Sequence, residues 1–571
     1  MAKFKVIVLC LVCMAVQTFA QQIFSENKYP LVDFRAPLDI VPPALAGSFG
    51  ELRSNHFHSG MDYRTNQRIG YPVYAIADGY ISRLRVQNSG FGLALYINHK
   101  NGYTSVYGHL SRFNTKIAEK VKSIQYQKKS YEIDDFPNEL LIPVRKGDII
   151  AYSGNTGSSG GPHLHFEIRD TKTEATINPQ LFGLNIPDNI PPVIYSLYAY
   201  RLNKKPFSEF IPKQALAITG AAGSYKAGTV SLSGEVGFGI VATDRHNGAS
   251  GLNGVYSIEL LLDGNHVFTS SVEKFEFEDS KAINSHIDYP TYLSTKRSIQ
   301  KSFVDPGNPL SIYSNLVNQG RIEFSDGKLH ELEYIVTDGK GNKSRLSFNV
   351  QADSKPAVYT DVLTPGTVRF PYDTVNEFSN NQIKLTLPKG TLYNDMNFSY
   401  KTLPKPVGNA YSAMHQIHNN VTPLHIGMEL WINAADLPEK LRSKALIVSS
   451  GRASHGGYYE NGFVKAKPRN FGSFFIAVDT VPPVILPQNI SDGKNMSGVS
   501  KMSFKLRDNL SGIQSFNGFI DGRWVLMEFD TKTASLWHTF DEQTGQGKHT
   551  FELVVKDMKD NSKTYSISFY K

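Results

Sequence analysis

Alternation of apolar and polar residues is the main pattern of this chain, and it predicts β-strands. Pro162–Ile168 and Tyr103–Leu110 both alternate in this way. Successive side chains of a strand point to opposite faces, so His163, His165 and Glu167 are expected to share one face. The apolar residues between them share the other face. The apolar face therefore suits a core, and the histidine face suits a functional site.

Short alternating segments recur along the rest of the chain, for example at Ser344–Val350 and Thr564–Tyr570. Aromatic residues make up 12% of the sequence and favour strands, while 46 Gly and 29 Pro supply turns. Leu437–Lys444 is expected to form one short helix. At 571 residues the chain is too long for a single core. We therefore predict a mainly β protein with several domains.

Two distant segments repeat the same order of motifs. Asp188–Ile194 recurs as Asp479–Ile485, and both read Asp-x-x-Pro-Pro-Val-Ile. Each is followed by a Ser-Gly dipeptide, an Asp-Gly turn and a closing turn. The closing turn begins at Asp338 in the first copy and at Asp557 in the second. Two diverged copies of a β-sandwich module explain this order. Calcium ligands are one interpretation of Asp338 and Asp557, but turn carboxylates are the stronger one.

The first 20 residues have the pattern of a secretory signal. Lys3 and Lys5 precede an apolar run at Val6–Val16, which is short for a membrane span, and Thr18–Ala20 offers a cleavage site. A retained anchor is the alternative. Both cysteines lie inside this segment, so the mature chain is expected to have none, as suits an exported protein stabilised by packing. We predict a location in the periplasm or cell envelope.

The formal charge of +8 falls by two, to +6, once Lys3 and Lys5 are removed with the signal. A modest positive balance favours anionic partners such as cell-wall polymers. The chain has no basic stripe interleaved with aromatic residues, so we expect no nucleic-acid partner. It also has no further run of 18 apolar residues, so we expect no transmembrane segment after signal cleavage.

Histidines are concentrated in the N-terminal third, where six of the 16 lie between His56 and His165. A His and an Asp four positions apart, His58 and Asp62, and the pair His163 and His165 provide ligands for one divalent metal. Zinc binds imidazole nitrogen and carboxylate oxygen, and a catalytic zinc keeps one coordination position open. His109, at the end of an alternating strand, is a further candidate for the site. That it is an ordinary structural histidine is an equally good interpretation.

These motifs, in this order, resemble the lysostaphin/LytM-type zinc metallopeptidases, which are peptidoglycan endopeptidases. The resemblance covers roughly residues 45–183. The segments that carry it are His58–Asp62, Tyr107–Leu110, Ser153–Gly157 and Gly161–Glu167.

The resemblance implies that His58, Asp62 and His165 bind one Zn²⁺. It also implies that His109 and His163 are catalytic residues beside the open coordination position. There they orient or deprotonate the attacking water and stabilise the oxyanion. Which of the two is the base is not determined by the sequence. Glu167 is interpreted either as a hydrogen-bond partner of a ligand histidine or as a surface carboxylate.

Two competing patterns are weaker. Gly157–Gly161 matches the serine-hydrolase elbow formally, but a proline and a histidine-bearing strand follow it where the elbow needs a helix. The helical zinc motif His-Glu-x-x-His is absent.

Asn114–Ile142 makes the connection after His109 longer than the minimal family pattern. It is expected to add a hairpin or helix that walls the substrate groove, or to form a passive surface loop.

We predict an N-terminal antiparallel β-sheet metallopeptidase domain followed by about three β-sandwich-like modules. The expected boundaries are a signal peptide at 1–20, the metallopeptidase domain at 21–187, an Ig-like module with an insertion around 270–325 at 188–352, a β-rich accessory module at 353–480, and a second Ig-like module at 481–571.

The predicted activity is zinc-dependent hydrolysis of peptide cross-links in bacterial peptidoglycan. D-alanyl–diaminopimelate bonds are favoured over glycine bridges, because the chain has no wall-anchoring or glycine-bridge-targeting motif. One alternative is a catalytically silent peptidoglycan-binding protein that regulates or activates other wall hydrolases. Another is an adhesion or scaffold protein, in which the C-terminal β-modules bind an envelope protein partner. A complete ligand set argues against the silent protein.

Overall fold

The computed structural model describes residues 28–31, 33–138, 142–184, 186–202, 211–249, 251–354 and 366–571. The predicted signal peptide lies outside these ranges. None of the helices within them is long and apolar enough to cross a membrane. The chain is mainly β, as predicted, and the long strands are joined by turns and a few short helices.

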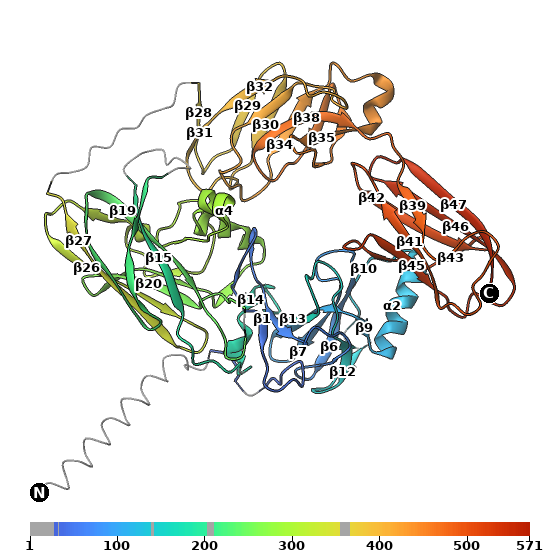
Figure 1. The fold of residues 1–571 in the computed structure, drawn as a ribbon, viewed down its shortest axis with the longest axis horizontal. Helices are drawn as coiled ribbons and strands as arrows, with labels where there is room; N and C mark the ends of the chain where they lie inside the picture. Colours follow the sequence, from blue (N-terminus) through green and yellow to red (C-terminus); the bar gives the residue numbers. More distant parts are fainter. Residues whose placement is uncertain are drawn as a thin grey trace, which may run out of the picture.

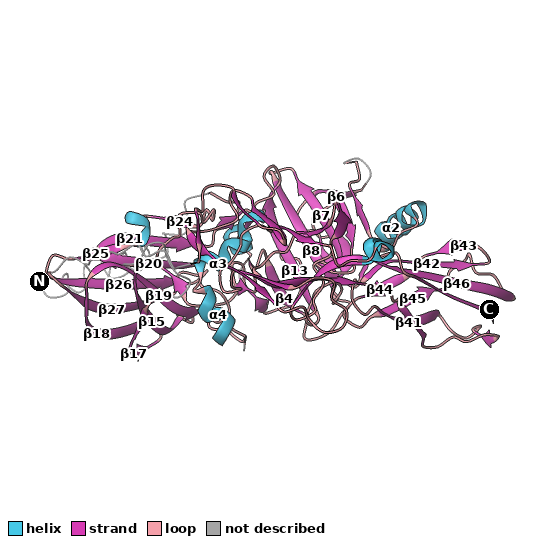
Figure 2. Ribbon diagram, turned by 90° about the horizontal axis from the view of Figure 1, so that it is seen from above, coloured by secondary structure: helices cyan, strands magenta, loops and turns pink. Residues whose placement is uncertain are grey.

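The described residues form four β-rich units, each with its own hydrophobic core. Figure 1 shows that the units follow one another around a ring, from the blue N-terminal unit through green and orange to the red C-terminal unit. The red unit lies beside helix α2 (Thr115–Lys128) of the first unit. Figure 2, turned by 90°, shows that this ring is flat.

The main sheet of the N-terminal unit is antiparallel, as predicted. Strand β13 lies in its middle, between β4 and β8, and the predicted strand Tyr103–Leu110 is β8 itself. In spatial order the strands are β1 (Leu45–Gly47), β4 (Met61–Arg64), β13 (His163–Asp170), β8 (Tyr103–Leu110), β7 (Leu93–His99), β6 (Gly79–Val86) and β10 (Ile133–Asp135).

One face of β13 belongs to the core, as the alternation predicts. Leu164, Phe166 and Ile168 have no exposed surface, and Tyr107 of β8 packs edge-on against Phe166 at 5.4 Å between ring centres. A buried aromatic or aliphatic side chain of this kind contributes about 1.5–3 kcal/mol. A small sheet of β5 (Pro72–Tyr74), β12 (Ile149–Tyr152) and β9 (Arg112–Phe113) contributes to the same core. The opposite face of β13 is thereby left for the site.

The segment Asn114–Ile142 contains a helix and an edge strand. Asn114 caps α2 by accepting a hydrogen bond from the Ile117 amide, and the helix ends where Lys129 adopts a left-handed conformation. Ile117 and other apolar residues of α2 face the core. Strand β10 then pairs with β6. The segment thus contains a helix, as one alternative predicted, and its role as a wall of the substrate groove stays a prediction.

The second unit is a sandwich of two sheets around one core. One sheet contains β16 (Lys213–Leu216), β15 (Val193–Arg201), β19 (Gly234–Thr243), β23 (Gln300–Lys301) and β25 (Ile322–Phe324). The other contains β17 (Ile218–Ala221), β18 (Ser224–Leu232), β27 (Lys343–Ala352), β26 (Leu329–Thr337), β20 (Ser257–Leu262), β21 (Asn265–Ser271) and β24 (Tyr313–Ser314).

Residues after β21 pack against the N-terminal unit. They include β22 (Lys274–Phe275), α3 (Ile283–His286) and α4 (Tyr289–Thr295). Phe275 and Ile283 share a small core with Phe49 and Phe57, and Phe57 belongs to the short strand β3 (His56–Phe57) that precedes His58. The second unit thus supports the segment that carries a predicted zinc ligand.

The fourth unit is also a two-sheet β structure, and the third adds a short sheet of β28 (Val368–Phe370) and β31 (Met396–Phe398) to its two larger sheets. The predicted helix at Leu437–Lys444 is instead a 3₁₀ helix at Glu439–Lys444, because an extended Pro438 precedes it. The sheets of the third unit contain β29 (Asn376–Ser379), β30 (Ile383–Leu387), β34 (Glu429–Asn433), β37 (Phe463–Ala466) and β36 (Tyr458–Glu460), and β32 (Tyr400–Leu403), β33 (Met414–Ile417), β38 (Gly472–Val478) and β35 (Ala445–Ser449). Those of the fourth contain β39 (Val484–Pro487), β41 (Lys501–Arg507), β45 (Ser535–Thr539) and β44 (Glu528–Asp530), and β40 (Lys494–Asn495), β47 (Ser562–Tyr570), β46 (Lys548–Asp557), β42 (Ile513–Ile520) and β43 (Arg523–Val525).

The fourth unit contacts the first through α2. Lys122 forms an ion pair with Asp541 at 2.8 Å, and the Tyr126 hydroxyl donates to the same carboxylate at 2.8 Å. The Tyr126 ring packs edge-on against Trp524. Lys532 reaches the loop before β13, where its ammonium donates to the backbone carbonyl of Asn155. These contacts close the ring.

Candidate metal centre

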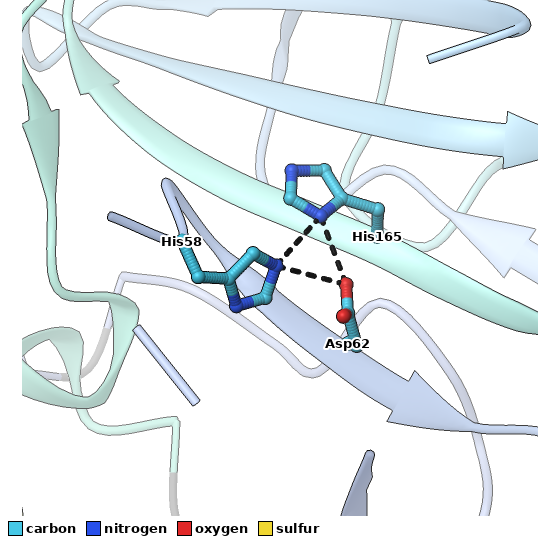
Figure 3. A group of neighbouring side chains, drawn as sticks. All are labelled: His58, Asp62 and His165. Carbon is cyan, nitrogen blue, oxygen red and sulfur yellow. Dashed lines mark hydrogen bonds and ion pairs between the residues drawn. The ribbon is translucent and has the colours of Figure 1, made fainter. Parts of the chain in front are cut away.

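Three side chains converge on one point, as Figure 3 shows. The Nε2 atom of His58 lies 3.0 Å from Oδ1 of Asp62 and 3.1 Å from Nδ1 of His165, and the His165 nitrogen lies 2.9 Å from the same oxygen. Ligands at about 2.0–2.1 Å from a tetrahedral zinc are separated by roughly 3.3 Å. All three residues are buried. The donor set and its spacing therefore fit a zinc ion.

The sheet register brings these residues together. His165 of β13 lies directly opposite Asp62 of β4. His58 precedes β4 by a tight connection that passes over β13 at Gly60. A Cβ atom at Gly60 would lie 2.3 Å from the Phe166 carbonyl oxygen. Glycine therefore allows the close approach that sets His58 beside Asp62.

Hydrogen bonds on the far side of each imidazole fix which nitrogen faces the centre. His58 Nδ1–H donates to the Ser48 carbonyl at 2.7 Å, which leaves Nε2 without a proton. His165 Nε2–H donates to Glu167 at 2.9 Å, which leaves Nδ1 without a proton. Such partners orient ligand histidines in metal sites. Glu167 has no exposed surface, so the alternative of a surface carboxylate is wrong.

Glu167 is itself held by two further residues. Arg169 donates from Nε at 2.7 Å and forms an ion pair at 2.6 Å, and the Ser59 hydroxyl donates to the other carboxylate oxygen. Burial opposes ionisation of Glu167, but Arg169 and His165 outweigh it and lower its pKa to about 2. Glu167 is therefore a charged acceptor that positions His165. Arg169 was not among the predicted site residues, although it lies two positions after Glu167 on the same strand face.

Asp62 is charged as well. Its Oδ2 atom accepts a hydrogen bond from Arg53 at 3.1 Å, from the short strand β2 (Leu52–Arg53). Burial opposes its ionisation, but His58 and the two histidines of β13 outweigh this and hold the pKa of Asp62 well below its usual range. No local pattern in the sequence marked Arg53 as a partner, because the contact arises only when β2 folds back towards β4.

A cation is needed where the three ligand atoms meet, because their lone pairs would otherwise repel one another. Burial lowers the pKa of His165, but Asp62 and Glu167 together outweigh it and raise this pKa to about 9. The two carboxylates therefore favour positive charge at this point, which a zinc ion would supply.

His109 and His163 border the same centre, so the structure gathers all five predicted site residues. Their rings are 4.9 Å apart, and His109 lies 5.8 Å from the His165 ring. His109 Nδ1–H donates to the Thr156 carbonyl at 2.8 Å, and His163 Nδ1–H donates to the Gly161 carbonyl at 2.8 Å. Both histidines therefore keep an unprotonated Nε2. The His163 Nε2 atom lies 3.3 Å from Asp62 Oδ1.

Two features set His109 apart. Its φ of +57° places it in the left-handed region, a conformation that costs of order 1–3 kcal/mol in a residue with a Cβ. Burial, and then the neighbouring His165 and His163, lower its pKa to about 3. His109 is therefore a neutral imidazole at neutral pH.

Phe91 forms an aromatic wall of the centre. Its ring stacks on His165 at 4.9 Å with an angle of 24° between the planes, and it meets His109 edge-on at 6.3 Å. It comes from the loop between β6 and β7. No local pattern marks Phe91 for this role, because an isolated aromatic residue beside a glycine is common in turns.

The model of peptidase family M23 matches residues 56–126 and 142–179, which include all five histidine and aspartate residues of the centre. The chain carries a peptidase family M23 domain. The gap in the match, 127–141, lies in the segment that follows His109. A second model, for a Zu5-like domain, matches residues 367–479.

Two curated relatives illustrate the similarity. The M23 domain is 34% identical over 137 residues to the DD-carboxypeptidase/endopeptidase Mpg of Neisseria meningitidis, covering 24% of this chain and 25% of that protein. It is 34% identical over 111 residues to the glycyl-glycine endopeptidase ALE-1 of Staphylococcus capitis, covering 19% of this chain and 24% of that protein. The match thus spans about a quarter of these relatives.

One solved structure with a similar fold is the catalytic domain of lysostaphin from Staphylococcus simulans. It is 26% identical in sequence and covers 24% of this chain and 87% of that domain, with a TM-score of 0.18.

Proposed function

We propose that this chain is an exported zinc-dependent endopeptidase that hydrolyses peptide cross-links of bacterial peptidoglycan. One observation carries the proposal. The Nε2 atom of His58, Oδ1 of Asp62 and Nδ1 of His165 meet within 3.1 Å of one another, and the far sides of both imidazoles are already engaged by acceptors. This arrangement is prepared for a divalent ion of the zinc class.

The protein side chains divide the chemical work. Zinc, when bound, supplies a Lewis acid that polarises the scissile carbonyl and makes water nucleophilic at neutral pH. His109 and His163 each offer an unprotonated Nε2 beside the three ligands. One takes a proton from the attacking water and delivers it to the leaving amine. The other, after it takes up a proton from solvent on Nε2, donates a hydrogen bond from that nitrogen to the developing oxyanion.

The loop before β13 keeps these two histidines in position. The Thr156 carbonyl orients His109 and the Gly161 carbonyl orients His163, so both rings depend on one stretch of backbone. The stacked Phe91 ring shields His165 from water on one side. Positioning of this kind lowers the entropy cost of reaching the transition state.

We propose D-alanyl–diaminopimelate cross-links as the bond that is cut. The support is the absence of wall-anchoring and glycine-bridge-targeting motifs from the sequence, together with the similarity to Mpg, whose name describes a DD-carboxypeptidase and endopeptidase. The similarity to the glycyl-glycine endopeptidase ALE-1 makes glycine bridges the competing substrate.

The decisive experiment is digestion of purified peptidoglycan, with the products mapped by mass spectrometry. The mature chain is compared with and without a chelator, beside His165→Ala and the matched control His56→Ala, which removes an exposed histidine of the same domain. Release of uncross-linked peptides by the wild type and control, abolished by chelator and by His165→Ala, is expected. No release from a chain shown to hold one zinc would favour the silent regulator.

A further inference from the structure

The two sandwich modules that repeat in the sequence also repeat a buried acidic cluster. In the second unit Asp188 and Asp244 lie together beside His246, and Asn342 joins Asp338 to the Asp188 backbone; in the fourth unit Asp479, Asp508 and Asp557 lie together. Each set has one residue in the linker that enters the module, one after an early strand, and one in the closing turn. The repetition is more than a similarity of turns, because residues far apart in sequence meet in both copies.

The closing turn is built identically in the two modules. In the second unit Asp338 accepts hydrogen bonds from the backbone amides of Lys340 and Asn342 at 2.7 and 3.0 Å. The Asn342 side chain donates to Asp338 at 2.7 Å and to the Asp188 carbonyl at 3.4 Å. The asparagine thus joins the closing turn to the linker.

The fourth unit repeats each of these contacts. Asp557 accepts from the backbone amides of Lys559 and Asn561 at 2.7 and 2.9 Å. The Asn561 side chain donates to Asp557 at 2.7 Å and to the Asp479 carbonyl at 2.9 Å. Two copies that have diverged in most positions have therefore kept one polar framework around their carboxylates.

The middle carboxylate of each cluster points to a missing ligand. Asp244 is 1% exposed, and among the described residues its Oδ1 atom has no hydrogen-bond partner. The Oδ1 atom of Asp508, which is partly buried, lacks a partner in the same way. Candidate ligand atoms of Asp188, Asp244 and His246 lie within 4.8 Å of one another, as do those of Asp479, Asp508 and Asp557. A buried carboxylate oxygen without a partner is costly.

Each cluster gathers three carboxylates, and the lysine of its closing turn, Lys340 or Lys559, is the cation beside it. The Lys559 ammonium, which lies next in the turn, donates to the Gly457 carbonyl of the third unit at 2.6 Å. In the second unit, burial and then Asp338 and Asp188 raise the pKa of Asp244 to about 8. The geometry therefore leaves a site that a cation would stabilise.

We propose that each sandwich module binds one Ca²⁺ ion, held by Asp188, Asp244 and Asp338 in the second unit and by Asp479, Asp508 and Asp557 in the fourth. Calcium prefers carboxylate and carbonyl oxygens in flexible arrangements of six to eight ligands. The fourth unit offers oxygen atoms alone, which favours calcium over zinc. His246 stands beside the first cluster, but Leu510 occupies the equivalent place in the second copy.

The bound ions would fix the joints between units. Asp188 follows the M23 domain directly, and Asp479 is the last residue of the Zu5-like match. An ion that shares ligands with the closing turn of the next module would tie each linker to the body of that module. Calcium is thus expected to make two joints more rigid, the one between the first and second units and the one between the third and fourth units.

The test measures calcium bound to the zinc-loaded mature chain, by equilibrium dialysis followed by elemental analysis. Two Ca²⁺ per chain are expected for the wild type, one for Asp244→Asn or Asp508→Asn, and none for the double variant. Matched controls are Glu331→Gln and Glu552→Gln, which remove one exposed negative charge from each module. They are expected to keep both ions.

Thermal unfolding of the wild type provides a second measurement that does not depend on how the variants fold. Calcium is expected to raise the Tm, and a calcium-selective chelator added to the zinc-loaded chain is expected to reverse this rise. Wild-type chain that binds no calcium and shows no rise in Tm would overturn the proposal. So would variants that fold normally and still bind two ions, or clusters that take up zinc and not calcium. None of these readouts depends on peptidase activity.

Discussion

At the scale of single residues, Glu167 controls the orientation of His165. It is buried on the site face of β13, and it joins the His165 imidazole to Arg169. Its carboxylate keeps the proton on Nε2 and the lone pair of Nδ1 directed at the centre. Outer partners of this kind are needed for metal affinity as well as for activity.

We predict that Glu167→Gln weakens zinc binding by about 10–100-fold, because an amide orients the imidazole less strongly than a carboxylate. Competition with a chromogenic chelator measures the Kd. Glu119→Gln, at an exposed position on α2 of the same domain, is the matched control. An unchanged Kd in a folded Glu167→Gln protein would mean that Glu167 has no role in positioning His165.

His109 contributes differently, because it borders the centre without belonging to the convergent ligand set. We predict that His109→Ala keeps one zinc per chain but lowers kcat by about 10²–10⁴-fold, the usual contribution of general acid–base catalysis. Zinc analysis and the peptidoglycan assay measure the two effects. If His109 is the base, the acidic limb of the pH–rate profile disappears in the variant and stays in His163→Ala. Loss of zinc from His109→Ala would instead make it a ligand.

At the scale of elements, the turn between β3 and β4 sets the spacing of His58 and Asp62. Gly60 crosses β13 so closely that a Cβ atom would overlap the Phe166 carbonyl. We predict that Gly60→Ala weakens zinc binding at least tenfold by moving His58 away from Asp62. The same chelator competition measures it. Gly228→Ala, where a Cβ would meet nothing within 4 Å, is the control and is expected to change neither zinc affinity nor Tm.

The same elements show which parts of the site the sequence could predict. The period-two pattern of Pro162–Ile168 placed His163, His165 and Glu167 on one face, because strand geometry is local. The resemblance to a known family supplied the partners from other strands. Arg53 and Phe91 were missed, because their contacts arise from a register and a loop path that no local pattern specifies.

The fold, like the site, could be predicted from the sequence only in part. Alternation and turn residues identified the strands and the mainly β class, since both are properties of neighbouring residues. The ring was not predicted, because it depends on side chains such as Lys122 and Asp541 that meet across more than 400 positions. The boundaries proposed for the modules remain predictions.

At the scale of the whole molecule, the fourth unit touches the loop that orients His109 and His163. The Lys532 ammonium donates to the Asn155 and Ser159 carbonyls, and the Ser159 hydroxyl lies 3.3 Å from His163 Nδ1. This loop also carries the carbonyl group of Thr156 that fixes His109. The C-terminal module is therefore part of the support of the candidate site.

We predict that Lys532→Ala lowers kcat about three- to tenfold and leaves zinc content unchanged, because the loop loses hydrogen bonds worth ~1 kcal/mol. The peptidoglycan assay and zinc analysis measure this. Lys548→Ala, which removes an exposed lysine of the same unit, is the control. A rise in activity would show that the contact restrains the enzyme, and the chain shortened to residues 21–480 should then rise as well.

The contact between Lys532 and Asn155 joins residues that are 377 positions apart. Because the chain links the two units, each experiences the other at an effective concentration that the length and stiffness of the link determine. For short flexible links this concentration is in the millimolar range. A few polar bonds that would not hold two separate proteins together are then enough to keep the ring closed. A single backbone cut between the first and fourth units would remove this advantage, and dilution alone would release the loop beside the active site.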